Sequence, residues 1–223
     1  MPNLQSMSDA LGLWNNAQRP MTKICRWSNF PEYGQTLVEH SNSLPIVADW
    51  IMSQLPEGFI LRPELVLRAC TLHDHGEPLL GEDVLFDNKS STRDLKEWEA
   101  FYSLTSKQHQ ADLFRRNLHE AFLLQFCLDK DFKPGDAYTK KIIKDLESLC
   151  EHEALAFECS EYMDYLFSAY AGHKRGIKNA EECMLEHTMD RVPRLLDELV
   201  SKCDIFGHIW TPQLKGELTE LSS

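Results

Sequence analysis

Hydrophobic residues recur every three or four positions along most of the chain, which is the spacing of residues on one face of an α-helix. This spacing predicts a helix over residues 36–55, in which Pro45 should either kink the helix or begin a new first turn. Pro63 opens a second segment, PELVLRACTLHD, which predicts a buried helix with proline in its tolerant first turn. We expect this helix to end near HDHGEP, because Gly76 and Pro78 do not readily continue a helix.

The same periodicity predicts further helices, separated by polar stretches or by stretches that contain glycine or proline. They span about residues 93–106, 110–128, 140–151, 153–171 and 178–202. The chain contains no internal repeat, and no shift in composition marks a domain boundary. We therefore expect an all-α fold, a compact single-domain helical bundle over residues 1–223, with 1–20 and 204–223 as peripheral tails. The tyrosines of the helix predicted over about residues 153–171, Tyr162 and Tyr165 among them, are expected in the core of the bundle.

Composition and charge narrow the class of protein. Of the 223 residues, 43% are hydrophobic, which is enough for a sizeable core and excludes a disordered chain. The net charge of −12 repels a phosphate backbone, so we expect no binding to nucleic-acid polymers. No run of about 18 apolar residues predicts a membrane span, and the first residues do not resemble a secretory signal. The cysteines are scattered without CxxC spacing, which is typical of reduced thiols in a cytoplasmic protein.

The stretch from Leu72 to Glu77 contains four candidate ligands or acid–base groups within five residues. It places His73, Asp74, His75 and Glu77 at the end of an apolar helix. An ionised aspartate in a buried helix needs a partner, and a metal ion is a common one. A His-Asp pair also arises by chance at exposed helix ends, so a helical scaffold without a metal site is an alternative.

Two other segments contain side chains of the same kind. His40 lies among apolar residues near the start of the first predicted helix. Glu161 and Asp164 are three positions apart in a largely apolar segment, so they share one face of a helix. A core or capping histidine and a solvated acidic face are the simpler interpretations of these two segments. Most other histidines, including His119, are expected at the surface.

The order His, His-Asp, Asp resembles the HD-domain superfamily of metal-dependent phosphohydrolases. The local sequence is similar to the bacterial 5′-deoxynucleotidase branch of that superfamily, which has an Arg-Trp pair before the first histidine, an HDxxE motif and a Gly-Asp soon after it. The matching stretches here are Arg26-Trp27, VEHS at His40, LHDHGE at His73 to Glu77, Gly81 and KEWEAF at 96–101. The resemblance covers roughly residues 24–105 and again about 155–200.

The resemblance implies a fold of HD-domain type and a set of site residues. The metal ligands that it implies are His40, His73, Asp74 and Asp164, with Glu161 as the alternative to Asp164. The catalytic residues that it implies are Glu77 and Asp74, and the substrate-binding residues are Arg26, Trp27 and Glu82. It further implies one divalent metal ion of the Mn, Co, Fe, Zn or Mg class, and it points to a homodimer.

The reaction implied by the resemblance is hydrolysis of a small phosphate monoester, with a (deoxy)nucleoside 5′-monophosphate as the expected substrate. Two imidazoles and two carboxylates suit a divalent ion that activates water and polarises a phosphoryl oxygen. Glu77 follows Asp74 by about one helical turn, so it can orient that water or protonate the leaving alkoxide. Arg26 offers a planar fork for the phosphate, and Trp27 could stack on a base.

The chain departs from this branch at three places. Glu82-Asp83 follows Gly81 where the family has Gly-Asp, Pro45 lies in the first metal-binding helix, and the connection over about 115–152 is longer. A non-catalytic metal- and nucleotide-binding HD module is therefore the alternative function.

Overall fold

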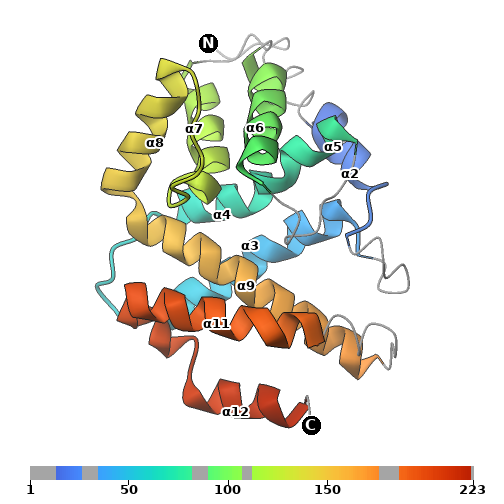
Figure 1. Ribbon diagram of the computed structural model, residues 1–223, viewed down its shortest axis with the longest axis vertical. Coiled ribbons are helices and arrows are strands. Elements are labelled where there is room, and N and C mark those ends of the chain that lie inside the picture. The colour runs from blue at the N-terminus through green and yellow to red at the C-terminus, as the bar shows by residue number, and fades with distance from the viewer. Residues whose placement is uncertain (1–13, 27–34, 82–89, 107–111, 176–185, 222–223) are drawn as a thin grey trace.

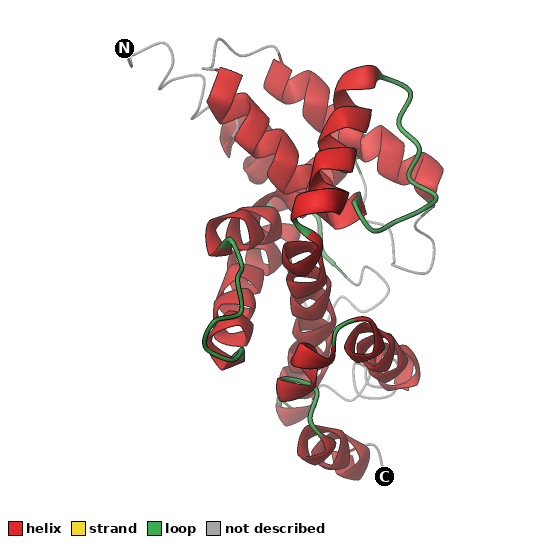
Figure 2. Ribbon diagram, turned by 90° about the vertical axis from the view of Figure 1, so that its left-hand side faces the viewer, coloured by secondary structure: helices red, strands yellow, loops and turns green. Residues whose placement is uncertain are grey.

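The computed structural model describes residues 14–26, 35–81, 90–106, 112–175 and 186–221. Within these ranges the regular structure is helical, apart from an isolated antiparallel bridge between Cys25 and Thr36. Figure 2 accordingly shows only helices and connecting loops. The prediction of an all-α bundle is confirmed for the described residues. None of their helices is long and apolar enough to cross a bilayer.

The elements follow one another along the chain with short connections. The longer helices are α3 (Leu37–Gln54), α4 (Pro63–Leu72), α6 (Ser91–Ser106), α7 (Asp112–Leu123), α8 (Ala137–Leu149), α9 (Glu151–Lys174), α11 (Glu186–Lys202) and α12 (Pro212–Leu221). The shorter ones are η1 (Trp14–Gln18), α2 (Arg19–Met21), η2 (His73–Gly76), α5 (Glu77–Leu80), η4 (Leu124–Phe126) and η6 (Asp204–His208).

Helix α3 begins with a capping box, in which Thr36 and Glu39 satisfy each other's backbone N–H groups. It continues through Pro45 as one helix, so of the two outcomes expected at the proline, a kink or a new first turn, the new first turn does not occur. Helix α4 begins at Pro63, as predicted, and its last residue is Leu72. The HDHG stretch then forms the tight turn η2.

Helix α9 organises the molecule. It runs diagonally past α3 and α11 in Figure 1, and it packs against α3, α4, α8 and α11. Buried apolar side chains from these helices, from α6 and α7 and from η6 form one continuous core. Because α3, η2 and α9 all border this core, polar side chains on their inner faces are brought together in its interior.

The C-terminal segment expected as a peripheral tail is packed onto this core. Phe206 in η6 is fully buried, and Ile209, Trp210 and Leu218 are nearly so. Helix α12 contributes to the lower edge of the molecule in Figure 1. The segment is mostly polar, but it has an apolar residue every few positions, which is enough for a short helix to pack against the core.

The expectation of a surface position for His119 is wrong. His119 is fully buried, with one ring nitrogen 2.8 Å from the Thr105 hydroxyl and the other 2.8 Å from the Tyr138 hydroxyl. Trp98 contacts its ring edge-on, with the centroids 5.2 Å apart. Two hydroxyl partners from distant segments satisfy the imidazole, so it can lie in an apolar interior.

Candidate metal centre

Three elements bring the predicted ligands together. Helix α3 supplies His40, the turn η2 supplies His73 and Asp74, and α9 supplies Glu161 and Asp164. All but Glu161 are almost completely buried, and the Glu161 side chain is 17% exposed. Ligand atoms of His40, His73 and Asp74 lie within 4.8 Å of one another. The convergence of distant segments that the sequence predicted is therefore present.

The two histidines face each other through the same ring nitrogen. Nε2 of His40 lies 3.2 Å from Nε2 of His73. Two imidazole nitrogens that bind one ion at about 2.1 Å, at angles between 90° and 109°, are separated by about 3.0–3.4 Å. The observed separation lies within this range.

The outer ring nitrogens already have partners that accept hydrogen bonds. Nδ1 of His73 lies 2.9 Å from the carbonyl oxygen of Cys70, which can only accept. Nδ1 of His40 lies 2.9 Å from the Asp164 carboxylate. With Nδ1–H donating outward in both rings, both Nε2 lone pairs point into the narrow space between them. Two such lone pairs repel unless a proton or a metal ion lies between them.

Carboxylates complete this inner side of the cluster. Asp74 Oδ1 lies 3.0 Å from Nε2 of His73, and Asp74 Oδ2 lies 3.7 Å from Nε2 of His40. Glu161 Oε1 lies 3.1 Å from the first of these nitrogens and 3.6 Å from the second. These spacings match those of neighbouring oxygen and nitrogen ligands on one divalent ion. The donor set present therefore fits a divalent metal ion.

The structure places the two acids that the sequence offered for the fourth ligand on different edges of the histidine pair. Asp164 lies on the outer edge of the His40 ring, beside Nδ1, whereas Glu161 lies on the inner edge, beside both Nε2 atoms. Asp164 was the preferred fourth ligand from the sequence. The arrangement here favours Glu161 for that position and gives Asp164 the task of orienting His40, as carboxylates commonly do for metal-bound histidines.

The electrostatics of the cluster reflect its excess of negative charge. Burial and Arg26 oppose protonation of His40, but hydrogen bonds to Asp164 and Glu161 outweigh them and raise its pKa to about 9. Burial disfavours the charge of Glu161, yet His73, His40 and Arg26 lower its pKa to about 2. Burial and then His73 lower the pKa of His75 to about 4, so this histidine remains neutral. Glu161 therefore keeps its negative charge beside the two histidines.

Arg26 is held over the cluster by local backbone structure. Its N–H donates to the Gln35 carbonyl at 2.8 Å, and the neighbouring Cys25–Thr36 bridge fixes it beside the start of α3. The guanidinium donates to the Tyr165 hydroxyl at 3.0 Å and lies 3.7 Å from Asp164. Burial opposes its charge, but Tyr165 and the neighbouring acids raise its pKa above the usual value. Arg26 is thus a fixed cation beside the candidate ligands.

Two of the predicted substrate residues, Trp27 and Glu82, lie outside the described residues, as does Asp83. Glu77 is buried at the start of α5 and lines the same cavity as Asp74 and Glu161.

Gly76 has a role that its position in the sequence did not indicate. The sequence pattern predicts only that Gly76 ends a helix. A Cβ atom at this position would lie 2.7 Å from the carbonyl oxygen of Glu97 in α6. The absence of a side chain lets α6 pack directly against η2, and this contact supports the turn that carries His73 and Asp74.

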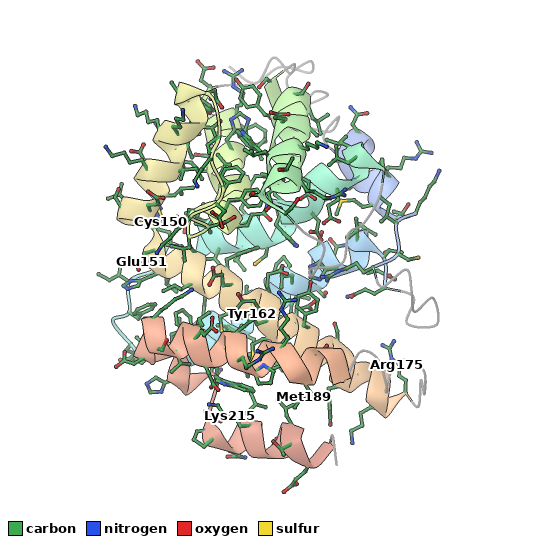
Figure 3. The ribbon with its side chains drawn as sticks, viewed as in Figure 1. Cys150, Glu151, Tyr162, Arg175, Met189 and Lys215 are labelled. Atoms are coloured by element: carbon green, nitrogen blue, oxygen red, sulfur yellow. The ribbon has the colours of Figure 1, made fainter. Side chains whose placement is uncertain are left out.

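The sequence interpretation also missed residues around the cluster. Tyr165 contacts Arg26, and Gln125 donates to the carbonyl oxygen of His73 at 3.0 Å. Tyr162 and Tyr165, expected in the core, line the cavity beside the ligands, and Figure 3 labels Tyr162 near the middle of α9. A sequence signal for this lining was present: four residues spaced by 3, 1 and 3 positions fall on one face of a helix. They are Glu158, Glu161, Tyr162 and Tyr165.

Compared with known proteins, the chain matches no family model, no curated protein and no solved structure.

Proposed function

We propose that this protein is a metal-dependent phosphohydrolase of HD-domain type that cleaves a small phosphate monoester. The expected substrate class is a (deoxy)nucleoside 5′-monophosphate. The observation that carries the proposal is the 3.2 Å approach of the two Nε2 atoms, with Asp74 and Glu161 on the same side of both rings. The sequence resemblance supplies the reaction class, and the donor geometry supports a divalent ion.

The residues that would hold the ion are His40, His73, Asp74 and Glu161. When bound, a divalent ion at this place supplies a Lewis acid for a phosphoryl oxygen and lowers the pKa of water. Asp164 keeps His40 in the tautomer that presents Nε2, and the Cys70 carbonyl oxygen does the same for His73. These two contacts prepare the site before substrate arrives.

The chain's own groups account for the remaining steps. Arg26 carries five N–H donors, one of which goes to Tyr165, so others are available to a phosphate oxygen. Glu77 would orient the attacking water or transfer a proton. The water oxygen forms a bond to phosphorus, and the ester P–O bond breaks with its electron pair on the alcohol oxygen. The proton lost by the water ends on that oxygen, so the products are the alcohol and inorganic phosphate.

The local positive charge matters because the protein as a whole is acidic. A substrate dianion approaches a chain with a net charge of −12 and a cavity lined by several carboxylates. Arg26 and the bound cation provide the attraction that the rest of the surface lacks. We therefore expect phosphate monoesters to bind only to the metal-loaded protein.

The test is phosphate release from a panel of nucleoside monophosphates, with the protein loaded with Mn²⁺ or Co²⁺. We expect turnover that is abolished in Asp74→Asn. The matched control is Asp49→Asn, which alters an exposed aspartate on α3, the helix that carries His40, and should leave turnover unchanged. Metal content and thermal unfolding of each variant show whether lost turnover reflects a lost ion or a lost fold.

Two other outcomes would replace this proposal. Nucleotide binding that depends on the metal but gives no phosphate release with any ion would favour the non-catalytic module. An absence of both metal binding and thermal stabilisation by divalent ions would favour a helical scaffold in which the His-Asp pair has no such role.

A further inference from the structure

A cavity of about 220 Å³ opens beside the candidate metal centre. One part of its wall is formed by Arg26, His73, Asp74, Glu77 and Glu161, where the phosphate would lie under the proposed function. Aromatic side chains from η4 and α9 line the same cavity: Phe126, Phe157, Tyr162 and Tyr165. A flat apolar ring of the alcohol half of a substrate fits such walls, because aromatic faces stack on one another.

Besides the tyrosine hydroxyls, the polar groups beside these aromatic side chains offer acceptors rather than donors. Asp129 and Glu158 line the cavity with carboxylates. Gln125 also lines it, but its amide nitrogen already donates to the carbonyl oxygens of His73 and Phe122, at 3.0 and 3.1 Å. With both amide hydrogens engaged, Gln125 can offer the cavity only its acceptor oxygen.

Nearby positive charge does not cancel this acceptor character. Lys202 Nζ lies 3.9 Å from Glu158, but its side chain is 55% exposed, so the pairing is weak. Asp129 accepts a hydrogen bond from the backbone N–H of Asp131 at 2.8 Å and retains further acceptor sites. A ligand in contact with these carboxylates gains by presenting N–H groups to them and loses by presenting carbonyl oxygens, because facing acceptors repel and remain unsatisfied.

We propose that this cavity selects nucleoside monophosphates whose base carries an exocyclic amino group, with cytosine preferred over uracil. The inference rests on the proposed function, since it concerns the alcohol half of the same substrate. Cytosine presents an amino group where uracil presents a carbonyl oxygen, and carboxylates accept from that amino group.

The experiment compares kcat/KM for deoxycytidine and deoxyuridine 5′-monophosphate, using the Mn²⁺-loaded protein. These substrates have the same sugar and phosphate and differ only at one edge of the base. We expect a preference of at least about 10-fold for the cytosine nucleotide. Glu158→Gln and Asp129→Asn each replace an acceptor-only group by an amide of similar size that can also donate, so each should reduce the preference. Asp49→Asn should retain it.

The outcomes separate this inference from the function on which it rests. If neither nucleotide releases phosphate, the proposed function is wrong. If both are cleaved with equal kcat/KM, the proposed function stands, but Asp129 and Glu158 do not discriminate between the bases. Faster cleavage of phosphoethanolamine than of either nucleotide would also overturn the inference, because the wall would then recognise a small ammonium group. The comparison within the wild-type protein decides the matter even if a variant fails to fold.

Discussion

Glu161 and Asp164 lie one turn apart on α9, and the structure gives them different tasks that two isosteric substitutions can separate. Glu161→Gln and Asp164→Asn each remove one negative charge and keep the size of the side chain. Their effects on the general electrostatic attraction for a cation are therefore similar. Any large difference in metal affinity between them must come from which edge of the histidine pair each carboxylate contacts.

The expected magnitudes follow from the distances. Asp164 contacts Nδ1 of His40 at 2.9 Å, on the side of the ring away from His73. Loss of such an orienting partner weakens metal affinity by about 10–100-fold, and the asparagine oxygen can still accept from Nδ1. Asp164→Asn should therefore fall at the lower end of this range. Glu161 lies 3.1 and 3.6 Å from the two Nε2 atoms, so Glu161→Gln removes a direct ligand and should exceed about 100-fold.

The assay is titration of the metal-free protein with Mn²⁺ or Co²⁺, using competition with a chelator for the tightest complexes. Asp49→Asn removes the same charge from an exposed position on α3 and serves as the control. Thermal unfolding without metal should also be recorded, because Asp164 lies 3.7 Å from the buried Arg26 and its loss leaves that cation less well compensated.

The reasoning fails if Asp164→Asn weakens metal binding as much as Glu161→Gln, or more. Asp164 would then be the direct ligand, as the sequence favoured, and α9 would have to turn relative to α3 in the loaded protein. Equal and small effects of both substitutions would instead place the ion away from α9.

Three further predictions concern groups around the centre. Gly76→Ala should destabilise the fold by about 1–3 kcal/mol, because the new Cβ atom would meet the backbone of Glu97. Denaturant unfolding measures this loss against the control Gly135→Ala, whose Cβ atom would meet nothing within 4 Å. Equal stabilities of the two variants would contradict the prediction. Glu77→Gln should lower kcat by about 10²–10⁴-fold with metal affinity nearly unchanged, and a wild-type kcat would exclude an acid–base role. Burial, helped by Arg115, lowers the pKa of His119 from 6.5 to about 4, so its contribution to stability is complete above pH 6.5 and is lost as the pH falls towards 4. That loss should total about 2–3 kcal/mol, and urea unfolding across this pH range should show it in the wild type but not in His119→Gln.

Local signals in the sequence sufficed for the features that depend on local structure. Pro63 marked the start of α4, because proline is tolerated in the first turn of a helix, and α4 ends just before the HDHG stretch, near the expected place. The expected reason does not hold, because Gly76 has helical dihedral angles and Pro78 lies within α5. The pairing of His40 with His73 was also expected, but from resemblance rather than from spacing alone. The structure places both imidazoles as that interpretation required.

Other features depend on how helices rotate and pack, which the sequence pattern does not specify. Glu161 and Asp164 share a helix face, and only the packing of α9 on α3 decides which one meets the inner edge of the histidines. His119 is buried because Thr105 and Tyr138 converge on it from other segments. Hydrogen bonds between a buried polar group and partners far away in the sequence produce no periodic pattern from which they could be predicted.

The packing of α9 also ties the two proposals together. Glu158, Glu161, Tyr162 and Tyr165 follow the spacing of one helix face, and all four line the same cavity. Under the two proposals, one helix would present a carboxylate to the histidine pair, aromatic side chains to a base and an acceptor to the edge of that base, at separations fixed by the helical pitch. A rotation of α9 that moved Glu161 away from the Nε2 atoms would also move these other side chains. Metal affinity and base preference should therefore change together in variants that disturb the packing of α9, and independently in variants that change only Glu158.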